Sequence, residues 1–316
     1  MKVFKTSEPM HVDSVLGMIY GEPGVGKTTL ACSADKPLLV DFDKGANIPF
    51  RGDTVAVSSW DEVENELMEY VRTNDYKTVI WDTVDTAREY LKEYLIEQDK
   101  QNGNKERYGR DPRRLAVGMQ DRMLPLVNKY KRSGINLILL AHVDEKEVNE
   151  ITQKRPLLSG KMGRELMNKC DYIAHLGWNN KTRVLMFNPS DVAYAKNRGN
   201  LEDYAINDFV VGKKNNDMAL IIGMILKNMN SFHEAHAEVA NKVGVYQLEI
   251  DQLTVENFNN WFKEDLPEIE RTEDKMVYEP IKKYLGTRAK ELKLSYDKAT
   301  KEFITIPEAE GEKSGT

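Results

Sequence analysis

The sequence predicts an α/β protein built on a mostly parallel, doubly wound sheet. Short apolar runs that end in polar residues alternate with helix-like segments along the first two thirds of the chain. The segment Gly21–Thr28 fits the pattern GxxxxGK[ST], and it stands between a strand-like run, Val15–Tyr20, and a helix-like run, Thr29–Ser33. A later hairpin pattern predicts a β-hairpin extension of the sheet, and the remaining chain predicts a mixed C-terminal appendage.

The glycine-rich segment predicts a site for a nucleoside triphosphate with Mg²⁺. Its glycines allow the backbone to bring N–H groups against phosphate oxygens. Lys27 is expected to reach the β- and γ-phosphates, and the Thr28 hydroxyl is expected to hold the metal ion. A chance glycine-rich turn is the alternative. The residues expected to contact ATP are Gly21, Glu22, Pro23, Gly24, Val25, Gly26, Lys27, Thr28 and Thr29.

Three further apolar runs predict parallel strands that deliver polar side chains to one edge of the sheet. Asp82 suits the Walker B role of holding Mg²⁺ directly or through water. The helix-like segments between the runs are Val63–Arg72 and Thr86–Gln98. The three runs are Pro37–Asp43, Lys77–Asp82 and Ile135–His142.

Each of these polar side chains also has a simpler interpretation. Asp41 and Asp43 are acids of the kind that cap a turn at the end of a strand. His142 is either a γ-phosphate sensor or a strand-end histidine without a ligand. Thr83 follows Asp82, where many P-loop ATPases have a glutamate that activates water. The general base must therefore come from elsewhere or be missing.

Length and composition predict a globular protein of the reducing cytoplasm. The chain has 316 residues, of which 41% are apolar, and a formal net charge of −6. Its two cysteines lack metal-ligand spacing, and no N-terminal export signal is recognisable. The longest apolar stretch, Met218–Leu226, is too short to cross a bilayer, so no membrane partner is expected.

Charge is unevenly distributed along the chain. Residues 99–132 contain ten basic and four acidic residues, a net charge of +6, which predicts one local patch that meets phosphate. Tyr108 in this segment suits base stacking, although a solvated surface loop is the alternative. At the other extreme, Pro307–Thr316 is acidic and is expected to be disordered.

Taken together, these motifs resemble the RecA-like ATPases, and they look closest to short phage-borne recombination ATPases of the AAA-family or single-strand-annealing type. The resemblance covers about Val15–Asn200. It implies ATP hydrolysis at a subunit interface, single-stranded DNA as a partner, self-association into a ring or filament, and a single-strand-binding or replication protein as a further partner. It rests on Gly21–Thr28, Asp41-Phe42-Asp43, Val79–Asp82, Ala141-His142 and Ala195-Lys196-Asn197-Arg198.

The resemblance also implies roles for single residues. Asp43 falls where the family has a carboxylate, usually glutamate, that orients the attacking water. His142 falls where the family has a polar residue, often glutamine, that senses the γ-phosphate and signals to a DNA-binding loop, here Val143–Lys161. The predicted DNA contacts in this loop and in the earlier basic segment are Arg107, Arg110, Arg113, Arg114, Lys154, Arg155 and Lys161.

Lys196 and Arg198 fall where RecA-like chains carry cations that reach the neighbouring subunit's nucleotide. An exposed polar turn before Gly199 is the alternative. A β-hairpin pattern, Tyr172–Leu176 followed by Arg183–Phe187, precedes these cations and would hold them on a rigid extension.

The predicted division of the chain is a core at 1–205, a mixed α/β extension at 206–265, and a charged helix with an acidic tail at 266–316. No chemistry is assigned beyond residue 205. The expected elements there are helices at Met218–Met229 and Phe232–Val243, a strand at Val245–Ile250, a closing element at Asp251–Phe262 and a helix at Tyr278–Leu294.

Two alternative functions stay open at this point. A small-molecule or nucleotide kinase also uses this loop and sheet, and the arginines near residue 110 would then form its lid. A replication accessory factor of the helicase-loader type would use ATP only as an assembly switch.

Overall fold

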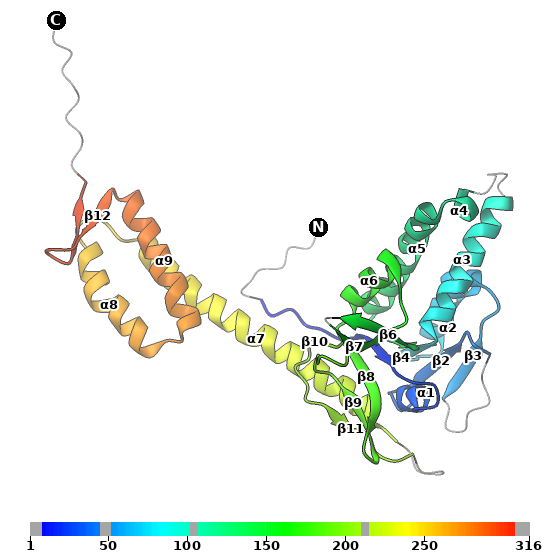
Figure 1. The fold of residues 1–316 in the computed structure, drawn as a ribbon. Helices are drawn as coiled ribbons and strands as arrows, with labels where there is room; N and C mark the ends of the chain where they lie inside the picture. Colours follow the sequence, from blue (N-terminus) through cyan, green and yellow to red (C-terminus); the bar gives the residue numbers. More distant parts are fainter. Residues whose placement is uncertain (1–7, 45–51, 102–106, 149, 210–214, 307–316) are drawn as a thin grey trace, which may run out of the picture. The chain divides into compact units, whose positions relative to one another are not determined.

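A computed structural model describes residues 8–44, 52–101, 107–148, 150–209 and 215–306 (Figure 1). The chain divides into two compact units, one from Val12 to Met229 and one made of Met1–His11 with Asn230–Thr316. The acidic tail that the sequence predicts to be disordered lies outside the described residues. Each unit has its own hydrophobic core, so each is described by itself.

The larger unit is built on a mainly parallel sheet. In the described part of the chain its strands run in the order β11-β9-β8-β1-β5-β4-β2-β3, and β10 pairs with β8. The six strands from β8 to β3 in this order are parallel. The bounds are β1 (Leu16–Tyr20), β2 (Pro37–Asp41), β3 (Asp53–Ala56), β4 (Thr78–Asp82), β5 (Asn136–Ala141), β8 (Tyr172–Asn179), β9 (Thr182–Met186), β10 (Lys196–Asn197) and β11 (Tyr204–Ala205). The predicted α/β fold with a mostly parallel sheet is confirmed.

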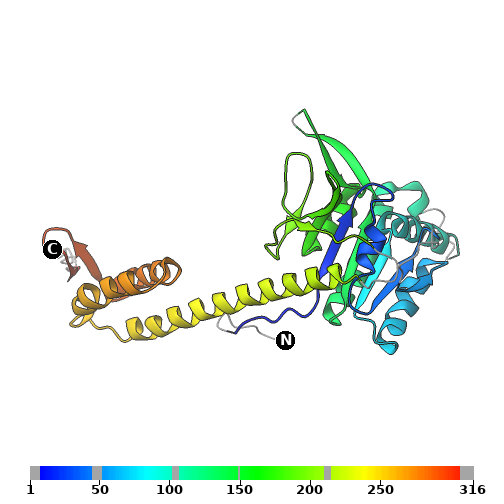
Figure 2. The same cartoon turned by 90° about the horizontal axis from the view of Figure 1, so that it is seen from below.

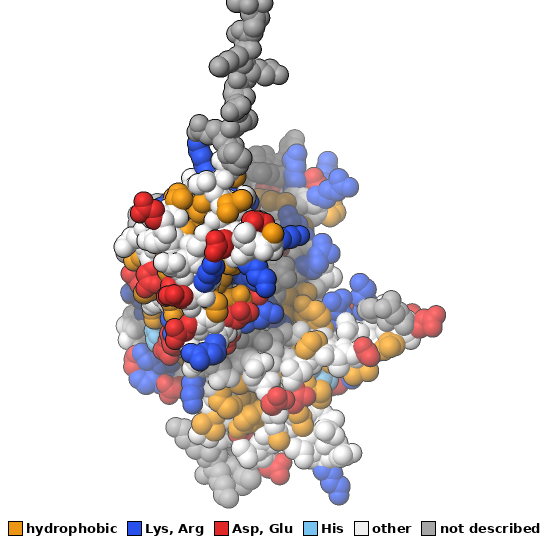
Figure 3. All heavy atoms as spheres, turned by 90° about the vertical axis from the view of Figure 1, so that its left-hand side faces the viewer, with side chains coloured by type: hydrophobic (Ala, Val, Ile, Leu, Met, Phe, Trp, Pro, Cys, Tyr) orange, Lys and Arg blue, Asp and Glu red, His pale blue; other side chains and the backbone are white. Residues whose placement is uncertain are grey.

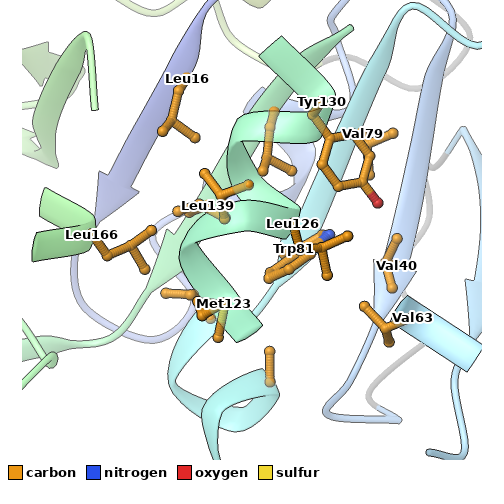
Figure 4. Close-up of a cluster of buried hydrophobic side chains, with 14 of the residues drawn as sticks. Leu16, Val40, Val63, Val79, Trp81, Met123, Leu126, Tyr130, Leu139 and Leu166 are labelled. Atoms are coloured by element: carbon orange, nitrogen blue, oxygen red, sulfur yellow. The ribbon is translucent and has the colours of Figure 1, made fainter. Parts of the chain in front are cut away.

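One face of this sheet is covered by the helices that lie between β3 and β8 in the chain (Figures 1 and 2). Alternate residues of β1, β4 and β5 point to this face, as the period of a strand requires. Trp81 and Tyr130 pack edge to face in its centre, with ring centroids 6.2 Å apart (Figure 4). The helical elements are η1 (Glu62–Glu66), α2 (Leu67–Thr73), α3 (Val84–Gln101), α4 (Arg107–Arg110), α5 (Pro112–Arg132) and α6 (Gly160–Lys169).

The opposite face is covered by α1 (Lys27–Ala31) and by the first part of α7 (Asp217–Asp251). Met218, Ile221 and Ile225 of α7 are fully buried there. The Met218 N–H also donates to the Ser33 hydroxyl at 2.9 Å. The larger unit therefore extends to Met229 rather than to the expected boundary at residue 205, because its second hydrophobic face needs this helix.

The predicted β-hairpin extension is present. β8 and β9 pair antiparallel, and Tyr204 of β11 pairs with Leu185 of β9. A second hairpin, β6 (Val143–Val148) with β7 (Ile151–Pro156), leaves the end of β5. The predicted DNA loop Val143–Lys161 is therefore this hairpin plus the start of α6. The basic segment that begins at residue 99 is largely helical where it is described, although a surface loop was one interpretation of it. Asp111 caps the start of α5 by accepting from two backbone N–H groups.

The smaller unit packs the remainder of α7 with α8 (Phe258–Thr272), α9 (Lys275–Glu291) and the hairpin of β12 (Leu294–Asp297) and β13 (Glu302–Thr305). The expected strand Val245–Ile250 is wrong, because Val243, Tyr246 and Ile250 follow helical spacing and face the core. The expected helices Met218–Met229 and Phe232–Val243 both belong to α7. Basic and acidic side chains are interspersed over the part of this unit that faces the viewer in Figure 3.

The structure groups residues 230–306 as one unit, whereas the sequence predicts a division near residue 265. The physical reason is a shared core: Trp261 and Phe258 of α8 lie in one cluster with Ile281 and Leu285 of α9. Within the described ranges, no helix combines the length and apolar character that a membrane crossing needs.

Candidate nucleotide site

The loop between β1 and α1 has the backbone that its glycines predict. Gly24 and Gly26 have φ angles of 74° and 101°, which favour glycine over any residue with a Cβ. A Cβ at Gly26 would also lie 3.1 Å from the Phe209 ring and 3.6 Å from Nε of Arg183. The loop is therefore held in a conformation that other residues cannot adopt without strain.

Lys27 is the cation of this loop and is 8% exposed. Its ammonium donates hydrogen bonds to the carbonyl oxygens of Gly21 and Glu22 at 2.8 and 3.1 Å. Burial lowers the pKa of Lys27, and the nearby carboxylates of Asp82 and Asp85 oppose that shift. A desolvated ammonium at the mouth of the loop is suited to bind phosphate oxygens, which would replace the solvent that it lacks.

Thr28 and Asp82 bring two oxygen ligands together beside this lysine. Thr28 Oγ1 donates to Asp82 Oδ2 at 2.7 Å. Neighbouring ligands of an octahedral Mg²⁺, with bonds of about 2.0–2.1 Å, lie about 2.9 Å apart, so these two oxygens fit adjacent positions on the ion. In the described residues no group of three or more His, Cys, Asp or Glu side chains could hold a metal. Water and nucleotide phosphates would have to supply the other ligands, as is usual for Mg²⁺.

Asp82 belongs to a group of carboxylates at the ends of β2 and β4. Burial raises its pKa, and the neighbouring charges of Asp43 and Asp41 raise it further. Asp41 lies opposite Asp82 in the strand pairing and is 4% exposed, and its Oδ2 has no hydrogen-bond partner in the described chain. Asp43 accepts from Thr83 Oγ1 at 3.4 Å. Buried negative charge with unmet hydrogen-bonding capacity is what a divalent cation neutralises.

His142 lies at the same edge because β5 stands between β1 and β4 in the sheet. Tyr20 pairs with Ala141, so His142 follows directly beside Gly21 of the phosphate loop. Its Nδ1 lies 2.5 Å from Oδ2 of Asp85, and its backbone N–H donates to Oδ1 of the same carboxylate at 3.3 Å. The structure thus brings the predicted residues Lys27, Thr28, Asp82, Asp43 and His142 to one edge of the sheet.

A cavity of about 410 Å³ opens on the outer side of the phosphate loop. Glu22, Lys154 and the exposed Trp178 contribute to its wall. His175 also lines it, is 7% exposed, and has no hydrogen-bond partner at either ring nitrogen in the described chain. Burial lowers the pKa of His175, which favours the neutral imidazole.

Lys196 and Arg198 are not part of this site. They lie at the opposite, amino-terminal edge of the sheet, where Asn197 pairs with Tyr172. The four residue steps of β1 separate the two edges by roughly 13 Å. Lys196 donates to the Asn168 carbonyl, and Arg198 pairs with the buried Asp171 at 3.5 Å. Within one subunit these cations therefore cannot reach the phosphate loop.

The first group of predicted DNA contacts is also remote. Arg110, Arg113 and Arg114 are exposed on α4 and α5, beyond the far end of α3. Since α3 begins beside the site and has 18 residues, this end lies about 27 Å away. Tyr108 packs against Gly118, where a Cβ would lie 2.8 Å from its ring. Tyr108 is partly buried there, and its availability for base stacking stays a prediction.

The second group lies close to the nucleotide site. Lys154 of β7 forms an ion pair with Glu22 of the phosphate loop at 3.0 Å. Its carbonyl accepts from the Tyr20 hydroxyl at 3.1 Å, so the strand is anchored beside β1. Arg155 lies over the Tyr194 ring, 4.9 Å from its centroid, and Lys161 is exposed at the start of α6.

Sequence reasoning missed four residues of this neighbourhood: Asp85, His175, Arg183 and Phe209. Asp85 follows Asp82 by three residues in the first turn of α3, so its position next to the Walker B strand was a usable signal. Arg183 lies between the rings of Trp178 and Phe209, 4.5 and 5.1 Å from their centroids. Nothing local in the sequence reveals that contact, because it depends on how the β8–β9 hairpin folds over the loop.

The fold and this site define a P-loop nucleotide-binding protein. Residues 14–199, more than half of the chain, match the AAA domain family. The chain therefore belongs to that family, and it is a P-loop ATPase.

A curated relative and two solved structures are also similar. The relative is the SPbeta prophage-derived uncharacterized protein YorG of Bacillus subtilis strain 168, which is 26% identical over 141 residues. That match covers 43% of this chain and 43% of the relative, so the chain spans less than half of the relative's length. One solved structure, an ATPase domain, is 12% identical with a TM-score of 0.37, over 62% of this chain and 81% of that one. The KaiC-like protein PH0186 of Pyrococcus horikoshii OT3 is 12% identical with a TM-score of 0.33, over 57% of this chain and 87% of that one.

Proposed function

We propose that this ATPase hydrolyses ATP with Mg²⁺ at an interface between subunits and acts on single-stranded DNA in recombination, annealing or repair, in a phage-encoded system. The observation that carries the ATP site is the 2.7 Å contact of Thr28 with Asp82 beside the buried Lys27. Lys27 and the loop amides bind the phosphates. Asp43 orients the attacking water.

Mg²⁺, when bound by Thr28 and Asp82, would supply positive charge against the β- and γ-phosphate oxygens. The protein supplies the rest of the environment. Lys27 adds a second, desolvated cation, and the glycine-rich backbone excludes side chains from the phosphates. Because phosphoryl transfer depends mainly on positioning and on charge stabilisation, these groups account for most of the expected rate enhancement.

Two contacts support a link between the nucleotide and the β6–β7 hairpin. The His142 carbonyl accepts from Leu157 N–H at 2.8 Å, so the hairpin leaves and returns at the same residue. Lys154 is tied to Glu22 of the phosphate loop. A nucleotide that alters either contact would change the relative free energies of two positions of the β6–β7 hairpin. If DNA binds one of these positions more tightly, DNA binding and ATP binding are then coupled.

The test of the ATP site is the hydrolysis rate with and without single-stranded DNA. Lys27→Ala should abolish Mg²⁺-dependent hydrolysis and its stimulation by DNA. Lys263→Ala removes an exposed lysine of the smaller unit and is the matched control. Hydrolysis by Lys27→Ala at the control's rate would contradict the site. Lys27-dependent hydrolysis that DNA leaves unchanged would contradict the DNA role and would favour the accessory-factor alternative.

The DNA-contact surface is tested by a salt titration of binding. Each phosphate contact in single-stranded DNA contributes about 0.7 to the slope of log K against log salt. Lys161→Ala and Arg155→Ala should each reduce the slope by about that amount. Arg271→Ala is the control, because this arginine is 78% exposed on the smaller unit. Equal slopes for all three variants would exclude the hairpin and α6 as the contact surface.

The interface is tested by mixing two inactive proteins. If Arg198 acts on the neighbouring subunit's nucleotide, Arg198→Ala lowers the hydrolysis rate by about 10³-fold or more. ATP binding should be spared. A mixture of Arg198→Ala with Lys27→Ala then regains activity, since some interfaces combine an intact Lys27 with an intact Arg198. No recovery in an assembled mixture would remove Arg198 from the mechanism.

The arginines on α4 and α5 lie too far from the loop to form the kinase lid in this conformation.

A further inference from the structure

All the hydrogen-bonding groups of His142 except one have a partner in the described chain. Its N–H and Nδ1 contact Asp85, and its carbonyl accepts from Leu157. In the described part of the chain, Nε2 is the ring nitrogen without a partner. The side chain is 36% exposed, so water can reach it. Asp85 therefore holds Nδ1, and Nε2 is left for a partner from outside the described chain.

The chemistry of Asp85 decides which nitrogen carries the proton. An ionised carboxylate only accepts hydrogen bonds, so the 2.5 Å contact requires a proton on Nδ1. A neutral imidazole with a proton on Nδ1 has a lone pair on Nε2. Such a nitrogen accepts a proton, and it cannot donate a hydrogen bond to a phosphate oxygen. This is the opposite of what a γ-phosphate sensor at this position needs.

We infer that His142 accepts the proton of the attacking water through Nε2, and that Asp85 is the positioning residue that fixes its tautomer. This inference rests on the proposed ATP hydrolysis and assigns the proton acceptor that Thr83 cannot provide. Asp43 keeps its proposed role of orienting the water. The arrangement of carboxylate, imidazole and acidic O–H is one that hydrolases of unrelated fold also use.

The water oxygen bonds to the γ-phosphorus while one of its protons moves to Nε2 of His142. The bond between the γ-phosphorus and the β–γ bridging oxygen breaks, and its electron pair leaves with ADP. The products are ADP, inorganic phosphate and an imidazolium paired with the Asp85 carboxylate. Because His142 is partly exposed, the imidazolium then returns its proton to solvent.

Glutamine at this position separates the two roles of His142. A glutamine side chain can still hydrogen-bond to a γ-phosphate, but it cannot take up a proton at neutral pH. His142→Gln should therefore keep ATP affinity and lower kcat about 100-fold, which is within the range for loss of a general base. A variant that hydrolyses ATP at the wild-type rate would overturn the inference and support the sensor role.

Asp85→Asn tests the positioning role with almost no change in shape. It should lower kcat at least about 10-fold while KM and ATP affinity are unchanged. Because both residues act through one group, the double variant should be no slower than His142→Gln alone. Independent, multiplying effects would overturn the dyad. If the wild-type protein shows no hydrolysis that depends on Lys27, the proposed function and this inference both fail. If Asp85→Asn is fully active, only the dyad fails.

A spectroscopic measurement tests the tautomer without reference to activity. In protein with ¹⁵N-labelled histidine, the His142 signals are assigned by their absence from His142→Gln. Nδ1 should be protonated and Nε2 should not be, at neutral pH. A proton on Nε2, whether in the other tautomer or in an imidazolium, would overturn the inference. In Asp85→Asn the preference for the Nδ1 tautomer should be weaker or lost.

Discussion

The two edges of the central sheet both hold buried carboxylates, but only one edge satisfies them. At the amino-terminal edge, Asp171 is fully buried and accepts from Leu16 N–H at 2.9 Å and from Lys131 at 2.7 Å. Arg198 adds a further contact at 3.5 Å. At the carboxyl-terminal edge, Asp41 Oδ2 lacks a partner in the described chain, and burial raises the pKa of Asp82.

The difference separates a structural cluster from a binding site. Cations and amides of the chain itself complete the first cluster, so its carboxylate stabilises the fold. The second cluster has excess negative charge, and a cation from outside the chain would complete it. Partner saturation, rather than burial or charge, therefore distinguishes carboxylates that the chain itself neutralises from those that would bind a cation.

Asp171→Ala should have the largest effect, and it should be on stability. It leaves Lys131 partly buried without its partner and leaves the Leu16 N–H without an acceptor. Because Lys131 is 37% exposed and can turn to water, the main loss is the buried N–H left unpaired, which costs about 1–3 kcal/mol. The free energy of unfolding, measured with urea, should fall by that amount, while protein that remains folded still binds ATP. A loss below about 1 kcal/mol would contradict the structural role of this edge.

Asp82→Asn should change stability in the opposite direction. Removing a desolvated charge that lies beside the carboxylates of Asp41 and Asp43 should raise the free energy of unfolding by about 0.5–2 kcal/mol in metal-free buffer. The same change should weaken ATP binding in Mg²⁺. The control is Asp61→Asn on the exposed surface, which should alter neither quantity. A less stable Asp82→Asn protein would mean that both edges are structural.

The pH dependence of stability should also show that the ionised Asp82 side chain destabilises the fold. The folded-state pKa of Asp82 is raised by burial, so folding takes up a proton as the pH falls through that pKa. Its contribution to stability is present at low pH and is lost as the pH rises through the folded-state pKa. The stability difference between Asp82→Asn and wild type should therefore shrink as the pH is lowered. A difference that grows instead would contradict this assignment.

Breaking the Glu22–Lys154 ion pair should have the smallest effect on stability. The Lys154 side chain is 35% exposed and the Glu22 side chain is 53% exposed. An exposed ion pair of this kind contributes about 0.2–1 kcal/mol to stability. A double-mutant cycle with Glu22→Gln and Lys154→Met measures it. The proposed coupling predicts a larger interaction between these residues in DNA-stimulated hydrolysis than in unfolding. Equal interactions would make the pair an ordinary surface contact.

The sequence was sufficient for the parts that depend on local pattern. The apolar runs before Asp82 and His142 predicted β4 and β5, and Gly21–Thr28 predicted the loop with its two positive φ angles. The strand prediction at Val245–Ile250 failed because a short apolar alternation has no unique period. The helical conformation is stabilised because it packs Tyr246 and Ile250 against α8 and α9.

The rest of the site depends on contacts between distant segments. Asp85 and His142 are 57 residues apart, and their pairing requires that β4 and β5 already be neighbours. The position of Lys196 and Arg198 likewise follows from the antiparallel return of β10 along β8. Sequence motifs identify which residues carry chemistry, but strand order determines which of them meet.

The central place of β1 has a consequence for synthesis on the ribosome. β1 carries the phosphate loop, but its partners come much later: Val15 bonds to Asn136, 121 residues on, and Leu16 bonds to Asp171, 155 residues on. Domains generally fold as units during translation, and contacts of such separation form slowly. The nascent loop therefore stays without its sheet until β8 has emerged, and ATP can assist folding only after translation of this unit is nearly complete.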